Sequence, residues 1–575
     1  MIGRLMPCVG KYKKYAILAP LTMLIEVSME VLLPIVMQMI IDNGIQARDA
    51  SYCLTWGLIM IGMSLLSLAG GALCGRFTAV AGTGFAAGVR KRLFDKVQDF
   101  SFYNVDKYST ASLVTRLTTD VNNAQNAFMT VIRSLIRAPG MLIFAIIMAF
   151  NINAKMSLIF VVAIPVLATA ILVIFSKANP RFRAMLRCYD NLNSDVQENL
   201  TSIRTVKSFV REDFEDEKFK KCSEDVRRTQ VAAEKLMIMM GPIMMICMYG
   251  CMLAVYWFGA KFTIAGEMTT GKIMSFLTYI MQVLMSLMMI AFSGIQLVIS
   301  RASVSRIVEV FDEKIDIDDA GADPDLKPAD GSISFRDVKF GYGKDDKNLV
   351  FDGINLEIKS GETVGIIGGT GSAKSTLVQL IPRLYDVCDG SVSVGGHDVR
   401  DYKLVNLRSD VAMVLQKNVL FSGTILENLR WGNENATMEE VIEAAKAAQA
   451  HDFIMSFPDG YDTDLGQGGV NVSGGQKQRL CIARALLKSP KVIILDDSTS
   501  AVDTATDANI RAAFRNNLNH ITTIIIAQRI SSVSDADKIV VLDDGKINGV
   551  GTHEELLAAN EIYRDVYTSQ NKEEN

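Results

Sequence analysis

The segment GETVGIIGGTGSAKSTL, residues 361–377, has the residue types and the spacing of a site for phosphate groups. It reads as a strand, a glycine-rich loop and the start of a helix, close to the pattern G-x-x-x-x-G-K-[ST]. The backbone N–H groups of residues 369–375 would surround phosphates at a helix N-terminus, where unpaired donors and the helix dipole favour anions. The predicted nucleotide-binding residues are Gly368, Gly369, Thr370, Gly371, Ser372, Ala373, Lys374, Ser375 and Thr376.

Two side chains of this segment add specific chemistry. Lys374 supplies a positive charge, and the hydroxyl of Ser375 is suited to ligate Mg²⁺. Ala373 stands where the pattern has glycine. Because it lies beside the predicted helix start, we expect it to have helical φ, which alanine tolerates.

A second segment, VIILDDSTSAVD at residues 492–503, supplies carboxylates. Four apolar residues followed by Asp496 predict a buried strand that delivers this carboxylate to the nucleotide, and Asp497 follows directly. Between the two segments lie Gln416, in VLQKNVLF, and the run VSGGQKQRLCIARAL at Val472–Leu486.

The elements that position these residues belong to the last part of a long chain. At 575 residues the chain is too long for one domain, and a mean hydropathy of +0.23 is unusual for a soluble protein. The apolar excess lies in the first part, which contains six apolar spans of membrane-crossing length. They lie near residues 15–41, 53–75, 131–150, 156–176, 236–260 and 273–299.

Three regions follow from this pattern. Residues 1–311 are predicted to form a transmembrane domain, residues 312–331 an acidic linker rich in turn formers, and residues 332–575 a nucleotide-binding domain. In the last region, short β-type runs alternate with helical segments, which predicts a sheet with parallel strands and flanking helices. The predicted fold class is therefore a membrane α-helical domain, with six transmembrane helices and long cytosolic extensions, fused to an α/β P-loop nucleotide-binding domain.

Charge flanking the spans predicts the orientation. Basic residues at positions 11, 13, 14 and 90–92 place the N-terminus in the cytoplasm, and six spans return the C-terminus to the same side. No cleavable signal sequence is evident, so the first span is expected to anchor the chain in the lipid bilayer. We expect a multi-pass protein of the cell inner (plasma) membrane, with both termini and the nucleotide-binding domain in the cytoplasm.

Charge and cysteine content argue against other functions. The formal net charge is −4 and there is no basic stripe, so no nucleic acid partner is expected. The nine cysteines form no CxxC pair, so neither a disulfide framework nor a zinc site is indicated. Cys247 and Cys251 lie one helical turn apart inside a span, where both simple packing and a redox role are open.

In their order and spacing, the phosphate loop, Gln416, the SGGQ run and the strand ending at Asp496 resemble the ATP-binding cassette (ABC) family. Six spans ahead of one cassette resemble a half-size ABC exporter, and the resemblance covers essentially the whole chain. It implies ATP and Mg²⁺ as ligands and a second half-transporter chain as partner. The cytosolic loops around Phe102–Ser112 and Arg211–Phe219 would transmit closure of the cassettes to the membrane domain.

The resemblance also implies individual roles. Tyr342 would stack on adenine, although packing on its strand is the alternative, while Gln416 would contact Mg²⁺ and Asp496 would hold the ion through water. The signature residues would close on ATP held by the opposite cassette, and a loop further on would contact the partner. These two groups are Ser473, Gly474, Gly475 and Gln476, and Ser500, Ala501, Val502 and Asp503.

Three residues depart from the family pattern near the catalytic chemistry. The family's general base is a glutamate where this chain has Asp497, one methylene shorter, and its switch histidine is replaced by Gln528. Gln528 can donate a hydrogen bond to a γ-phosphate but cannot serve as an acid or base. Gln467 stands where the family often has glutamate. Asp497 and Gln528 could each be a tolerated variant of an active enzyme, but their joint occurrence favours a site that binds Mg-ATP and hydrolyses it slowly.

Because the signature is intact, the chain resembles the degenerate-site subunit of heterodimeric bacterial ABC exporters of the multidrug type. Two alternatives remain open, a homodimer with two slow sites and a non-transporting ATP-sensing membrane regulator. The heterodimer and the homodimer would both move solutes, whereas a regulator would use ATP only as a ligand.

Residues inside the spans suggest what is moved. Glu26 and Glu30 lie one turn apart in the first span and either face a substrate cavity or pair with Arg133 or Arg137 of the third span. The fifth and sixth spans are rich in methionine, which adapts to varied hydrophobic partners. The predicted cavity residues are Glu26, Glu30, Met244, Met248 and Met285, and the predicted substrates are hydrophobic or amphipathic molecules such as drugs, lipids or peptides.

Overall fold

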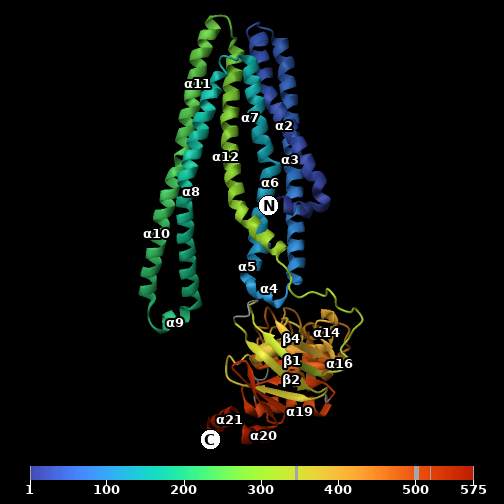
Figure 1. The fold of residues 1–575 in the computed structure, drawn as a ribbon. Coiled ribbons are helices and arrows are strands. Elements are labelled where there is room, and N and C mark those ends of the chain that lie inside the picture. Colours follow the sequence, from blue (N-terminus) through green and yellow to red (C-terminus); the bar gives the residue numbers. More distant parts are fainter. Residues whose placement is uncertain (1, 344–347, 498–503, 518–519, 574–575) are drawn as a thin grey trace. The chain divides into compact units, whose positions relative to one another are not determined.

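The computed structural model describes residues 2–343, 348–497, 504–517 and 520–573 (Figure 1). The chain divides into two compact units. The first unit comprises Met1–Gln98 and Thr110–Glu313, and the second comprises Asp99–Ser109 and Lys314–Asn575. The second unit therefore includes a short piece of chain that lies, in sequence, inside the first.

The first unit contains six helical segments long and apolar enough to cross a membrane, which confirms the six predicted spans. These segments are Gly3–Ile45, Ala50–Gln98, Thr110–Ile152, Leu158–Thr201, Glu212–Ile264 and Thr270–Asp312. Their main helices are α2 (Lys13–Met39), α3 (Ala50–Gln98), α5 (Thr110–Thr115), α6 (Val121–Ile132), α7 (Ser134–Ile152), α8 (Leu158–Thr201), α10 (Glu212–Ile238), α11 (Met240–Ile264) and α12 (Thr270–Asp312). With 44 residues, α8 is about 66 Å long and extends well beyond a hydrocarbon core of about 30 Å.

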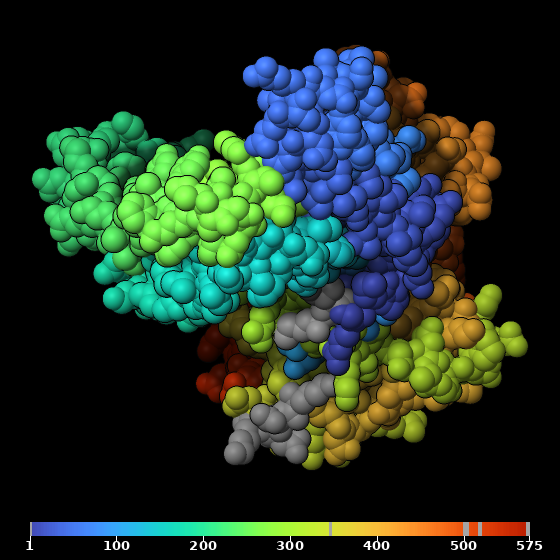
Figure 2. Space-filling view, turned by 90° about the horizontal axis from the view of Figure 1, so that it is seen from above, coloured from blue at the N-terminus to red at the C-terminus, as the bar shows by residue number. Residues whose placement is uncertain are grey.

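The core of the first unit forms where α2, α7, α8, α11 and α12 meet, around buried residues such as Met23, Val27 and Val283. Polar side chains fix the contact between α2 and α12. The Tyr279 hydroxyl donates to the carbonyl of Val31 at 2.7 Å, and Ser275 donates to the carbonyl of Pro34. The antiparallel pair formed by α8 with α10 and α11 stands apart from the other helices of this unit along much of its length (Figures 1 and 2).

Two sheets and surrounding helices form the second unit. One sheet has the order β2-β1-β4-β5 and the other β10-β9-β3-β8-β7-β6, in which β3, β6, β7, β8 and β9 pair in parallel, as predicted. The strands are β1 (Ile333–Phe340), β2 (Phe351–Ile358), β3 (Thr363–Ile367), β4 (Asp389–Val394), β5 (His397–Asp398), β6 (Val411–Val414), β7 (Val492–Asp496), β8 (Thr522–Ile526), β9 (Lys538–Asp543) and β10 (Lys546–Gly551). The helices of this unit include α4 (Phe102–Lys107), α13 (Lys374–Gln379), α14 (Leu404–Asp410), α15 (Ile425–Arg430), α16 (Met438–Ala447), α17 (His451–Met455), α18 (Gly474–Leu487), α19 (Thr504–Asn517), α20 (His553–Ala559) and α21 (Glu561–Glu573).

The larger sheet brings several functional segments to one edge. Parallel strands β3, β7 and β8 are neighbours, and each is fully or largely buried because apolar residues fill it. Ligands of open α/β sheets bind outside the carboxyl ends of such strands. The residues that follow these three ends include the phosphate loop, Asp497 and Gln528, so the sheet itself assembles the candidate site.

Candidate functional site

The phosphate loop joins β3 to α13, as its sequence predicts. Gly368 is required by close packing, because a Cβ there would lie 2.1 Å from the carbonyl oxygen of Leu542. Lys374 donates to the carbonyls of Gly368 and Gly369 at 2.9 and 2.7 Å, so its side chain folds back over the loop. Burial lowers the pKa of Lys374, while the charges of Asp496 and Asp497 oppose that shift.

The expected helical conformation of Ala373 is wrong. Its φ is +69° and its ψ is 23°, which is the left-handed conformation that glycine adopts without cost. The turn into α13 therefore favours the glycine of the general pattern. Alanine adopts this conformation at the cost of a close approach between its Cβ and its carbonyl oxygen. Sequence position beside a helix did not reveal this, because the N-cap residue itself lies outside the helix.

Two of the three predicted magnesium ligands lie in direct contact. The hydroxyl of Ser375 donates to Oδ1 of Asp496 at 2.8 Å. Asp496 is buried, and burial raises its pKa; the neighbouring charge of Asp497 adds to the shift, and the bond from Ser375 and the charge of Lys374 oppose it. Hydroxyl and carboxylate oxygens are ligands that Mg²⁺ prefers, so the donor set fits the predicted ion.

At the same edge of the sheet, two glutamine side chains donate to one carboxylate oxygen of Asp497. Gln528 and Gln416 each donate from Nε2 to Oδ2 of Asp497, at 2.8 and 3.2 Å. The backbone of Asp497 is in the left-handed region, with φ of +48°, and its N–H donates to the carbonyl of Ile526 on β8 at 3.0 Å. Asp497 is thus a fixed hydrogen-bond acceptor that holds both glutamines.

The signature residues form a helix start of their own. Ser473 is the N-cap of α18: its hydroxyl accepts from the backbone N–H of Gln476 at 3.3 Å, and its own N–H donates to the Gln476 side chain at 2.8 Å. Ser473 and Gly474 are exposed, so the N-terminus of this 14-residue helix is open to an anion. Ser500–Asp503, the predicted dimer-contact loop, lies outside the described residues.

Tyr342 lies beside the phosphate loop. Its hydroxyl shares a hydrogen bond of 2.8 Å with the hydroxyl of Thr376, and its ring meets those of Phe340 and Tyr385 edge to face. Tyr342 is 45% exposed. Adenine stacking by Tyr342 stays a prediction.

Sequence reasoning missed how α4 joins this region. Tyr385 donates to Asp106 of α4 at 2.6 Å, and the amide of Asn104 donates to the carbonyl of Lys314 at 3.0 Å. Burial raises the pKa of Tyr385, and the hydrogen bond to Asp106 adds to the shift. Since the Tyr385 ring also packs against Tyr342, with centroids 5.3 Å apart, and Tyr342 bonds Thr376, α4 connects through two tyrosines to the phosphate loop. The resemblance implied a transmitting role for the loop around Phe102–Ser112, but not these partners.

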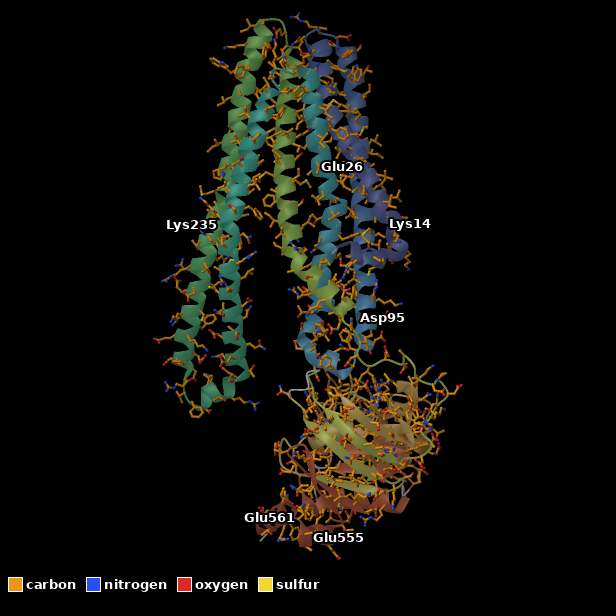
Figure 3. All side chains as sticks on the ribbon, in the orientation of Figure 1. Lys14, Glu26, Asp95, Lys235, Glu555 and Glu561 are labelled. Atoms are coloured by element: carbon orange, nitrogen blue, oxygen red, sulfur yellow. The ribbon has the colours of Figure 1, made fainter. Side chains whose placement is uncertain are left out.

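In the first unit, Glu26 and Glu30 pair with Arg137. Figure 3 marks the position of Glu26. Both distances to the guanidinium are 2.9 Å, whereas Arg133 is exposed at the break between α6 and α7. Met244 and Met248 pack against the core, but Met285 is 62% exposed. The predicted cavity residues therefore divide into an ion-pair cluster, two packing residues and one exposed residue.

Replacing Gly71 with alanine should destabilise the helical unit by about 1–3 kcal/mol. A Cβ at Gly71 of α3 would lie 3.0 Å from Oε2 and 3.1 Å from Cδ of Glu26, so this carboxylate, which pairs with Arg137 through Oε1, would have to shift by a few tenths of an ångström. Gly75→Ala is the matched control, because a Cβ there meets no atom within 4 Å. Thermal unfolding of the two purified variants measures the difference, and equal stabilities would contradict the expectation.

Comparison with known proteins agrees with this geometry. A family model described as ABC transporter transmembrane region matches residues 16–287, and one described as ABC transporter matches residues 351–500. The chain is 37% identical over 561 residues to an uncharacterized ABC transporter ATP-binding protein, YfiB, of Bacillus subtilis, with 97% of both proteins covered. It is 36% identical over 476 residues to an ATP-dependent lipid A-core flippase of Desulfotalea psychrophila, covering 82% of each. A solved structure of a bacterial Atm1-family ABC exporter with ATP bound matches with a TM-score of 0.81 and 26% identity, over 97% of this chain and 98% of that one.

Proposed function

The chain belongs to the ABC transporter family, and we propose that this ABC exporter works as one half of a heterodimer whose own ATP site hydrolyses slowly. The observation that carries the proposal is the carboxylate of Asp497, which accepts hydrogen bonds from both Gln416 and Gln528. A general base must reach the attacking water, and a side chain one methylene shorter than glutamate loses that reach. Gln528 cannot replace the missing proton transfer because an amide does not titrate.

The same site keeps what binding requires. When Mg-ATP is present, the loop 368–376 would hold its phosphates, and Ser375, Gln416 and Asp496 would face the Mg²⁺ ion, which neutralises phosphate charge. Lys374, now bonded to loop carbonyls, would exchange those acceptors for phosphate oxygens. Binding would therefore persist where turnover is slow.

The exposed N-terminus of α18 supports the heterodimer. A chain that turned over ATP poorly at both sites of a homodimer would have little reason to retain a fully formed signature helix start. In a heterodimer, Ser473 and its neighbours would instead complete the partner's competent site, where helix-end donors stabilise developing phosphate charge.

The proposed substrates are hydrophobic or amphipathic molecules, moved out of the cytoplasm or the inner leaflet of the plasma membrane. One relative carries lipid A-core as the molecule named in its description. Within this chain the exposed Met285 is the residue of the predicted cavity best placed for such a molecule, because polarizable methionine adapts to varied apolar partners. Both termini and the nucleotide-binding domain are proposed to be cytoplasmic.

Purification of the full chain with an affinity tag tests the proposal. The expected result is recovery of a second ABC half-transporter in equal amount, and trapping of ATP at one of two sites per complex. Directional solute movement in vesicles would separate an exporter from an ATP-sensing regulator. Self-dimers with ordinary ATPase activity would contradict both the heterodimer and the slow site.

A further inference from the structure

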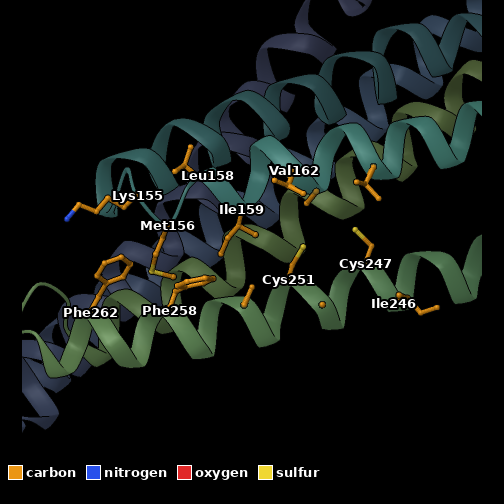
Figure 4. A pocket seen from close by; sticks show the side chains of 14 residues that line it. Lys155, Met156, Leu158, Ile159, Val162, Ile246, Cys247, Cys251, Phe258 and Phe262 are labelled. Carbon is orange, nitrogen blue, oxygen red and sulfur yellow. The ribbon is translucent and has the colours of Figure 1, made fainter.

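Helices α8 and α11 line an apolar groove, and none of its lining residues belongs to the predicted nucleotide site. Its volume is about 570 Å³, within the range of sites that hold small molecules. Ile159, Val162 and Ala163 line it from α8, and Cys251, Ala254 and Phe258 line it from α11 (Figure 4). Both wall helices belong to segments that are long and apolar enough to cross a membrane.

The rim of the groove is apolar as well. Leu158, Val162, Val166 and Ile246 are between 57 and 74% exposed along its opening. In a membrane-crossing segment, a surface of this kind contacts hydrocarbon chains. The groove is therefore continuous with a surface that is already suited to lipid.

An acyl chain suits this groove better than an inserted loop or strand of protein. Walls without hydrogen-bonding groups cannot satisfy the backbone of an inserted loop or strand, whereas an acyl chain has no polar group to satisfy. A void would forfeit dispersion contacts along both helices, and a chain of methylenes can follow its shape. Inside a bilayer the hydrophobic effect does not favour one lipid over another. A preference for one lipid headgroup must therefore come from polar side chains at the end of the groove.

Two opposite charges lie at that end. Nζ of Lys155 is 3.3 Å from Oε2 of Glu267, with side chains 69 and 48% exposed, and it lies 5.7 Å from the ring centroid of the groove residue Phe262. We propose that the groove holds one acyl chain of a phosphatidylethanolamine-type lipid, a zwitterion with a primary ammonium. Its phosphate pairs with Lys155 and its ammonium donates to Glu267, so the ion pair that closes the groove recognises both charges of one headgroup. The site goes beyond the exporter function, because it depends neither on nucleotide hydrolysis nor on which leaflet this end faces.

Photocrosslinking tests the acyl chain. The full chain, assembled as it is purified, is reconstituted with a phosphatidylethanolamine that carries a diazirine in its acyl chain, and crosslinked peptides are mapped by mass spectrometry. Crosslinks are expected in 156–166 and 246–258. Gly250→Leu should abolish them, because Gly250 lines the groove and a Cβ there meets nothing within 4 Å, so leucine fills the groove without strain.

Gly241→Leu is the matched control. Gly241 lies on the same helix, its Cβ position is equally open, and it does not line the groove, so its crosslinks should equal those of the wild type. Groove crosslinks that persist in Gly250→Leu would overturn the proposal. Protection of the wild-type groove from lipid by a second chain would overturn it too.

The headgroup is tested with a choline lipid of the same acyl chains. Its quaternary ammonium has no N–H to donate, so the wild type should crosslink it less than the ethanolamine lipid, by about two- to five-fold for an exposed ion pair. Glu267→Gln should remove that preference, and Lys155→Gln should weaken both lipids. Equal crosslinking of the two lipids by the wild type would overturn the headgroup assignment.

Discussion

Replacing Ser473 with alanine should lower ATP turnover of the assembled transporter by about 10²–10³-fold, the usual cost of losing a donor to the transition state. Asp497→Ala should change turnover little. The difference follows from geometry: Ser473 opens the exposed N-terminus of α18, proposed to face the partner's nucleotide, whereas Asp497 lies at this chain's own phosphate site. Steady-state ATPase activity of each variant, assembled with the wild-type partner, measures both effects.

Loss of the helix cap must be separated from loss of the donor, because an N-cap serine replaced by alanine also costs about 0.5–2 kcal/mol of stability. Thr437→Ala removes the equivalent capping box of α16 and is expected to leave turnover near the wild-type rate. Ser473→Asp keeps a capping side chain but faces phosphate with negative charge, so it should be as inactive as Ser473→Ala. If Asp497→Ala abolished turnover and Ser473→Ala did not, this chain would be the competent half.

Local pattern was enough to predict part of the structure. The β3–loop–α13 segment and the strand ending at Asp496 follow from short runs of apolar residues and glycine, and the six spans follow from composition alone. These features depend on residues close in sequence, so no tertiary contact had to be known. The observed contact of Ser375 with Asp496 is consistent with the roles toward Mg²⁺ that were predicted for each residue.

Tertiary contacts decided what the sequence could not predict. From the sequence, either Arg133 or Arg137 could pair with Glu26 and Glu30. In the structure Arg137, on α7, forms both ion pairs, whereas Arg133 lies at the break between α6 and α7. Likewise, Asp106 meets Tyr385 across more than 270 positions of sequence, a contact that no local period reports.

The convergence of both glutamines on Asp497 is the most informative of these contacts. Asp497 and Gln528 each look like a tolerable variant when read alone. In the structure they share a hydrogen bond of 2.8 Å, and the left-handed backbone of Asp497 suits aspartate better than a longer side chain. The two departures are thus parts of one arrangement, and changing either residue alone breaks the hydrogen bond between them.

This coupling leads to the second large effect. The double variant Asp497→Glu with Gln528→His should raise hydrolysis at this chain's own site by about 10²-fold, because glutamate regains the reach of a base and histidine regains a titratable group. Each single change should do much less, since base and switch act as a unit. Single-turnover hydrolysis, measured in a complex whose partner site is inactivated, reports this site alone.

A matched control distinguishes chemistry from repacking. Asp497→Gln with Gln528→His has nearly the same shape as the active double variant, but its amide cannot accept a proton, so it should remain slow. Both variants should bind ATP as the wild type does, because Lys374, Ser375 and Asp496 are unchanged in each. Equal rates in the two double variants would show that the site does not lack a general base. Rapid turnover by the wild-type chain alone would contradict the slow site itself.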